Sequence, residues 1–235
     1  LVQGDRLLLA QKTYRILVLA GLVPALLGAM LVLLFLREKR RPHSATAPLS
    51  GLDWSGFDIR FRRFLLIIFL FTLGSFSDAF LALRAQDIGA STLLVILLLV
   101  AFRAVYSLVA LPAGVLSDRF GRKRILTAGW MLHALIYLGF AMAGAGWQVW
   151  MLYLLHGLYL GATKGVERAF VADLVPASGS RGTAYGIFNA TVGFTALPAS
   201  VIAGFLWQSV APGAAFLVGA ALSLLAVSLL VLLIR

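Results

Sequence analysis

Long apolar stretches separated by short polar segments run along most of this chain of 235 residues. A helix that crosses the bilayer needs about 20 predominantly apolar residues, and seven windows of that kind can be counted. They cover residues 16–36, 64–83, 92–116, 125–145, 149–174, 183–207 and 214–234. The pattern predicts an all-α integral membrane protein in which each window forms one span.

Composition supports the same fold class. Hydrophobic residues make up 61% and charged residues 12% of the chain, whereas a globular domain carries about 45–50% apolar and about 25% charged residues. The net charge of +11 would suggest nucleic acid in a soluble protein, but in a membrane protein it is typical of basic loops at the cytoplasmic face. We therefore expect the lipid bilayer as a partner and no nucleic acid.

The chain offers little for catalysis or metal binding. It contains no cysteine, and its three histidines, His43, His133 and His156, show no ligand spacing. Neither HExxH nor GxSxG occurs in the sequence, so these zinc and serine-nucleophile motifs are absent. We expect no cofactor, no metal and no enzymatic activity.

One long polar connection, residues 37–63, separates the first window from the other six. Its centre, residues 53–61, mixes aromatic and charged residues, and it either lies on lipid headgroups or forms a flexible linker. If this connection is cytoplasmic, alternation places 13 of the 20 basic residues in the cytoplasm and four on the opposite side. The predicted location is the cell inner (plasma) membrane, multi-pass, with the 37–63 loop and the C-terminus cytoplasmic. The chain begins with Leu1 rather than Met, and we expect a piece of a longer protein.

The turn between the third and fourth windows carries a specific pattern. It reads Gly-Val-Leu-Ser-Asp-Arg-Phe-Gly-Arg-Lys, and its defining positions are Gly114, Asp118, Arg119, Gly121, Arg122 and Lys123. We expect Gly114 to let two helices approach, Asp118 to accept hydrogen bonds from a helix N-terminus, and Gly121 to permit the tight turn. The basic residues would hold the loop at the anionic cytoplasmic surface. A simpler interpretation is an ordinary positive-inside loop.

This pattern resembles the loop signature of the major facilitator superfamily, and residues 167–186 look like the turn between helices ten and eleven of its bacterial permeases. The resemblance implies that residues 1–36 end an N-terminal half with helix six, residues 37–63 form the central cytoplasmic loop, and residues 64–235 form the C-terminal six-helix bundle. It also implies secondary active transport of a small solute by alternating access, with the missing N-terminal half as a partner and the loop as a conformational switch. The alternative is a non-transporting structural or receptor-like membrane protein.

Apart from Asp173, which lies next to the end of the fifth window, five charged residues fall inside the predicted spans: Asp78, Arg103, Lys164, Glu167 and Arg168. A charge at mid-bilayer costs roughly 2.5–3.5 kcal/mol on insertion scales, so such groups are usually paired, wetted or functional. We predict that they bind substrate or couple transport to protons, and that the three cations face one concave surface. Asp78 is either the proton-coupling carboxylate or one half of a structural ion pair with Arg103 or Lys164. The surplus cation would meet a carboxylate of the missing half or an anionic group on the substrate.

Glycine recurs every four residues in the fifth window, at Gly157, Gly161 and Gly165. This spacing is typical of close packing between membrane helices. Lys164 and Arg168 fall on the same face of that helix, which places two cations within the small-residue stripe.

Overall fold

The computed structural model describes residues 22, 26–27, 30–31, 57–175 and 181–234. The chain divides into two compact units, residues 1–52 and residues 53–235. In the first unit the described positions are helical. Most of the predicted first span and of the 37–63 loop lies outside the described residues, so the domain boundaries inferred from the sequence stay predictions.

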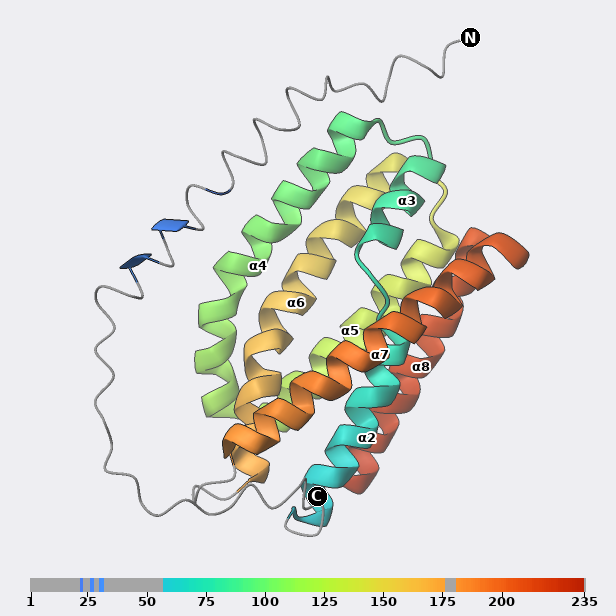
Figure 1. The fold of residues 1–235 in the computed structure, drawn as a ribbon. Helices are drawn as coiled ribbons and strands as arrows, with labels where there is room; N and C mark the ends of the chain where they lie inside the picture. Colours follow the sequence, from blue (N-terminus) through green and yellow to red (C-terminus); the bar gives the residue numbers. More distant parts are fainter. Residues whose placement is uncertain (1–21, 23–25, 28–29, 32–56, 176–180, 235) are drawn as a thin grey trace. The chain divides into compact units, whose positions relative to one another are not determined.

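The described part of the second unit contains helices and no strand, which confirms the all-α fold (Figure 1). The helices are α2 (Ile59–Gly74), α3 (Ala79–Asp87), α4 (Thr92–Phe120), α5 (Arg122–Met142), α6 (Gly146–Leu174), α7 (Arg181–Ser209) and α8 (Pro212–Leu233). α4 packs along α6, α2 packs along α8, and α5 contacts both α6 and α8. The bundle therefore has α5 at its centre, where Trp130 and Tyr137 are almost completely buried.

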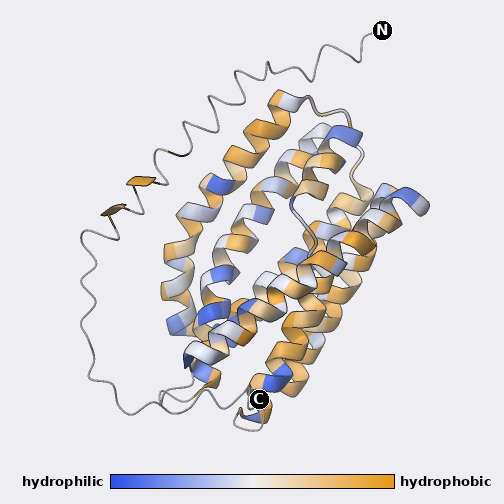
Figure 2. Cartoon of the chain, in the orientation of Figure 1, coloured by the Kyte–Doolittle hydropathy of each residue, from blue (hydrophilic) through white to orange (hydrophobic). Residues whose placement is uncertain are grey.

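Five helical stretches are long and apolar enough to cross a membrane: Ile59–Asp87, which joins α2 and α3, together with α4, α5, α7 and α8. α6 has the same length as α4 but is not among them. It carries Lys164, Glu167, Arg168 and Asp173 in its second half, and Figure 2 shows hydrophilic positions toward that end of α6. The lower hydropathy of its sequence, rather than its length, therefore distinguishes α6 from these five stretches.

The second predicted span, residues 64–83, falls within the single apolar stretch Ile59–Asp87, but this stretch is interrupted, which the sequence did not indicate. α2 ends at Gly74, α3 begins at Ala79, and residues 75–78 connect them without helical structure (Figure 1). Gly74 lies against α8, because a Cβ built on it would come 2.8 Å from the carbonyl oxygen of Gly219. The hydroxyl of Ser77 accepts a hydrogen bond from the backbone N–H of Ala79 at 3.3 Å, an alternative to helical pairing that serine and aspartate favour. Hydropathy alone does not detect such a break.

The glycine stripe of α6 packs against α4 at two of its three positions. A Cβ on Gly161 would lie 2.7 Å from the carbonyl oxygen of Tyr106, and one on Gly157 would collide with the carbonyl oxygen of Phe102. A Cβ on Gly165 would meet nothing within 4 Å. The packing interpretation thus holds for Gly157 and Gly161, whereas Gly165 borders open space.

Candidate functional site

Two adjoining cavities open beside the break between α2 and α3. The larger, of about 480 Å³, is lined by the break, α4, α6 and α7, with Ser75, Ser77, Asp78, Arg103, Lys164 and Ser200 among its polar residues. The smaller, of about 300 Å³, is lined by α4, α6 and α7. Tyr106 and Lys164 line both. Irregular backbone at membrane depth is tolerated where it lines such a polar cavity.

Asp78 lies at the wall of the larger cavity and faces two different surroundings. One carboxylate oxygen is 3.7 Å from Nη2 of Arg103, whose side chain is 64% exposed. The other oxygen is 3.2 Å from Nε2 of His156, whose side chain is only 3% exposed. Asp78 therefore connects the open cavity to the interior of the bundle.

His156 is a site residue that the sequence reasoning missed. The spacing of the three histidines bears on whether they could bind a metal together. It gives no information on whether one of them forms a hydrogen bond with a carboxylate. The available signal was an ionisable side chain within an apolar span, which is by itself a functional hypothesis.

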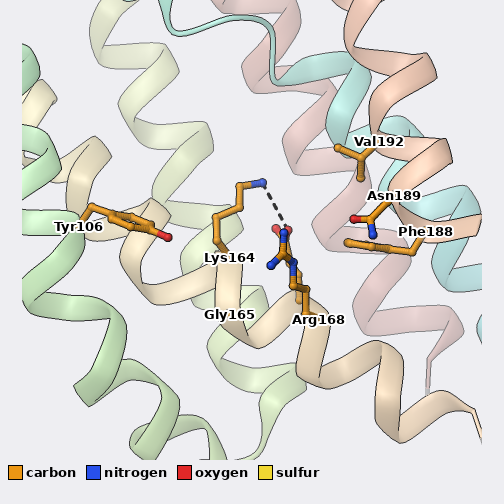
Figure 3. A pocket seen from close by; sticks show the side chains of 8 residues that line it. Tyr106, Lys164, Gly165, Arg168, Phe188, Asn189 and Val192 are labelled. Carbon is orange, nitrogen blue, oxygen red and sulfur yellow. Dashed lines mark hydrogen bonds and ion pairs between the residues drawn. The ribbon is translucent and has the colours of Figure 1, made fainter. Parts of the chain in front are cut away.

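The smaller cavity gathers the charges of α6 (Figure 3). Nζ of Lys164 is 3.3 Å from Oε2 of Glu167, and Oε1 of Glu167 accepts a hydrogen bond from Nε1 of Trp130 at 3.1 Å. Figure 3 shows Lys164 and Arg168 extending from α6 into the space between Tyr106 of α4 and Phe188 and Asn189 of α7. Glu167 is buried and held from two sides, whereas Arg168 is exposed and has no ion-pair partner among the described residues.

The structure thus brings the five predicted charges into two adjoining cavities. Arg103 and Lys164 line the larger one, and Lys164 and Arg168 line the smaller one. Asp78 pairs with Arg103, and Lys164 pairs with Glu167.

The patterned turn between α4 and α5 is held by Arg122. Its guanidinium is 3.3 Å from Oδ1 of Asp118 and 2.5 Å from Oδ1 of Asp173, near the end of α6, and it also donates to the carbonyl of Ala169 at 2.7 Å. Gly121 has φ +90°, which side chains rarely adopt, so the expected tight turn is present. The turn is therefore tied to the C-terminal end of α6.

Three expectations for this turn need correction. A Cβ on Gly114 would meet nothing within 4 Å, so Gly114 makes no close helix contact among the described residues. Asp118 pairs with the Arg122 side chain where we expected a helix N-terminus as its partner. Nζ of Lys123 donates to the carbonyls of Val231, at 3.1 Å, and Ile234. Arg122 and Lys123 therefore make contacts within the protein that the sequence did not indicate, because carboxylates and the carbonyls at a helix C-terminus attract cations.

Residues 64–235 match the sequence profile of the Major Facilitator Superfamily. The chain belongs to this superfamily. It is 33% identical over 212 residues to an uncharacterised MFS-type transporter of Methanocaldococcus jannaschii, which covers 87% of this chain and 52% of that protein. It is also 32% identical over 111 residues to a class B tetracycline resistance protein of Escherichia coli, covering 47% of this chain and 27% of that protein. The chain thus spans about half the length of the first relative.

Membership in the major facilitator superfamily confirms the resemblance drawn from the loop between α4 and α5. It makes the chain part of a multi-pass membrane protein, in agreement with its apolar helices. The lipid bilayer is therefore the medium of the helix bundle.

Proposed function

We propose that this chain is the C-terminal half of a secondary transporter that moves a small solute by alternating access, working against a missing N-terminal half. The observation that carries the proposal is the cavity at the helix break, where charged groups lie within membrane-spanning segments. Such groups are costly in a bilayer and are retained where they serve a solute or ion path. We expect no enzymatic activity.

The exposure of the helices supports the same proposal. In the most apolar window of each helix, 17% of residues are buried in α4 and in α7, against 44% in α5 and 39% in α8. Both of these least buried helices border the two cavities, together with α6. Their open faces suit a second half that closes over the site.

Within this proposal the charged groups have separate roles. Arg103, Lys164 and Arg168 contact the solute, Glu167 fixes Lys164, and Asp78 is the coupling carboxylate for protons. The ion pairs of Asp78 with Arg103 and of Lys164 with Glu167 would be loosened or replaced when solute or proton binds. The mid-membrane charges argue against a purely structural or receptor-like protein.

Alternating access predicts that a cysteine at the cavity wall is reached from both sides of the membrane. Ser200 lines the larger cavity, and the chain has no cysteine of its own. We expect Ser200→Cys in the full-length protein to react with a membrane-impermeant maleimide added to either side. Ser223→Cys, at a position with 0% exposure on α8, should react from neither side. Labelling of Ser200→Cys from one side alone, under all conditions, would contradict alternating access.

The proposed orientation has its own test. The basic residues place the 37–63 loop, the turn before α7 and the C-terminus in the cytoplasm of an inner (plasma) membrane. We expect Ser44→Cys and Ser180→Cys to be labelled only from the cytoplasmic side and Gly146→Cys only from outside. Opposite labelling of Ser44→Cys and Ser180→Cys would show that the number of spans between them is wrong.

The turn between α4 and α5 is proposed to act as a conformational switch. Asp118→Asn weakens the contact to Arg122, and Gly121→Val forces a side chain into a positive φ. We expect both variants to insert normally but to slow the two-sided labelling of Ser200→Cys by on the order of tenfold, which corresponds to about 1.4 kcal/mol. Arg124→Gln, at an exposed neighbouring position, is the control. Unchanged labelling rates in both variants would remove the turn from the mechanism.

A further inference from the structure

A cluster of buried polar rings lies behind Asp78, between α5 and α6. It consists of His133, His156 and Tyr159, which we call the polar-ring cluster. The ring centroids are 4.7 Å apart for His133 and Tyr159, 5.6 Å for His156 and Tyr159, and 6.4 Å for the two histidines. Their residues are 0–2% exposed, and none of them lines either cavity.

The polar-ring cluster holds most of the unpartnered polar atoms of the bundle interior. Among the described residues, five buried side-chain nitrogen or oxygen atoms have no hydrogen-bond partner. Three of them are Nε2 of His133, Nδ1 of His156 and the hydroxyl of Tyr159. Buried polar atoms are nearly always satisfied by protein or by ordered water. Three such atoms on neighbouring rings point to a shared partner.

The hydrogen bonds around the cluster fix where its protons lie. The Ser223 hydroxyl donates to the carbonyl of Gly219 at 2.8 Å, so it accepts from Nδ1 of His133 at 2.9 Å. The carboxylate of Asp78 can only accept, so Nε2 of His156 donates to it at 3.2 Å. In neutral imidazoles the two remaining nitrogens are therefore both acceptors.

The polar-ring cluster consequently has fewer hydrogen-bond donors than acceptors. Tyr159 has one hydroxyl proton for two imidazole acceptors; the Ser75 side chain lies near its hydroxyl, but within 3.5 Å the hydroxyl makes no hydrogen bond to the described part of the chain. A water molecule supplies two O–H donors and accepts as well. At hydrogen-bond lengths of about 2.8 Å, it bridges acceptors up to roughly 5.6 Å apart; the ring centroids of the two histidines are 6.4 Å apart.

We propose that water occupies the polar-ring cluster and that His156, together with this water, forms a second position for the coupling proton behind Asp78. The proposal rests on the proposed function, in which Asp78 is the coupling carboxylate. Asp78 takes the coupling proton from the larger cavity, which it lines. With Asp78 protonated, the neutral His156 ring carries its own proton on Nδ1, donated to the water, and accepts the carboxyl proton at Nε2, which leaves Asp78 as a carboxylate. The resulting imidazolium keeps its Nε2–H on the Asp78 carboxylate and donates Nδ1–H to the water. Release reverses these steps.

The elements packed around His156 carry several charged and titratable groups. They are Asp78 at the break, Arg103 and Tyr106 on α4, His133 and Tyr137 on α5, and Tyr153, Tyr159 and Lys164 on α6. The carboxylate of Asp78 is the group among them that directly bonds the ring. It compensates an imidazolium at this position, whereas Ser223 is the one hydrogen-bond partner of His133 among the described residues.

Hydroxyl-radical footprinting of the purified full-length protein tests the water. Radicals generated by an X-ray pulse oxidise buried side chains that contact bound water. We expect Tyr159 to be oxidised at least roughly tenfold faster than Phe216, which is also 0% exposed. His133→Phe, which removes one acceptor and fills space, should slow oxidation of Tyr159. A Tyr159 as unreactive as Phe216 in the parent protein would overturn the water site.

A second measurement tests the proton position. We expect the pH midpoint of Ser200→Cys labelling to move by at least one pH unit in His156→Gln and in His156→Asn. His43→Gln, in the long polar connection, is the matched control. An unchanged midpoint in both His156 variants would overturn the second proton position. If the parent shows no pH dependence at all, the coupling role of Asp78 fails instead, and the footprinting result still decides whether the cluster holds water.

Discussion

Replacing Gly161 by leucine should destabilise the full-length protein by about 1–3 kcal/mol, the usual cost of overpacking a filled interior. A Cβ at this position would lie 2.7 Å from the carbonyl oxygen of Tyr106 and 2.9 Å from Cβ of Val109. A backbone carbonyl cannot rotate away as a flexible side chain can, so α4 and α6 must separate. The measurement is the thermal unfolding midpoint in detergent, where each kcal/mol corresponds to about 2–4 °C for a chain of this size.

Gly165→Leu is the matched control for this prediction. It lies one helical turn further along α6, and a Cβ there would meet nothing within 4 Å. Both substitutions gain the same helix propensity over glycine, up to roughly 1 kcal/mol, so the difference between them reports packing. Equal unfolding midpoints for the two variants would show that the contact between α4 and α6 at Gly161 is not tight.

The helical fold could be predicted from the sequence because the bilayer imposes a simple requirement. Each span must be apolar over about 20 residues and must satisfy its own backbone hydrogen bonds. The windows at residues 92–116 and 125–145 accordingly fall on α4 and α5. The break after Gly74 could not be predicted in this way, since hydropathy carries no information about where the backbone departs from a helix or about the contact of Gly74 with Gly219 of α8, far along the chain.

Of the candidate site, only the charged residues could be predicted from the sequence. The cost of placing ions in lipid singled out Asp78, Arg103 and the charged residues of α6. It did not identify their uncharged or remote partners. His156 and Trp130 contact Asp78 and Glu167 across sequence separations of 78 and 37 residues, and such pairings follow from tertiary packing rather than from local pattern. The bond between Arg122 and Asp173 is remote in the same sense.

Asp78→Asn should make the conformational equilibrium of the transporter insensitive to pH. The substitution keeps the shape of the side chain but fixes it in a neutral state, so the protein no longer responds to the loss or gain of that proton. With Ser200→Cys as the reporter, we expect the labelling rate of the parent to change at least about tenfold over the pH range in which the protein stays folded, a bias of about 1.4 kcal/mol. The rate in Asp78→Asn should change less than about twofold, a bias below roughly 0.4 kcal/mol.

Asp87→Asn is the matched control, because Asp87 is also half-exposed and paired with an arginine, Arg84, at 2.5 Å, but does not line either cavity. It should retain the pH dependence of the parent.

The competing role for Asp78 is a structural ion pair with Arg103, in which Oδ2 of Asp78 and Nη2 of Arg103 are 3.7 Å apart. In that case Asp78→Asn would leave Arg103 unpaired and lower the unfolding midpoint. Adding Arg103→Gln to the same chain would restore the midpoint, and the pH dependence of labelling would persist throughout. If Asp78 is the coupling carboxylate, the pH dependence of labelling is lost in Asp78→Asn and stays lost in the double variant. Removing Arg103 cannot return a proton-binding group to position 78.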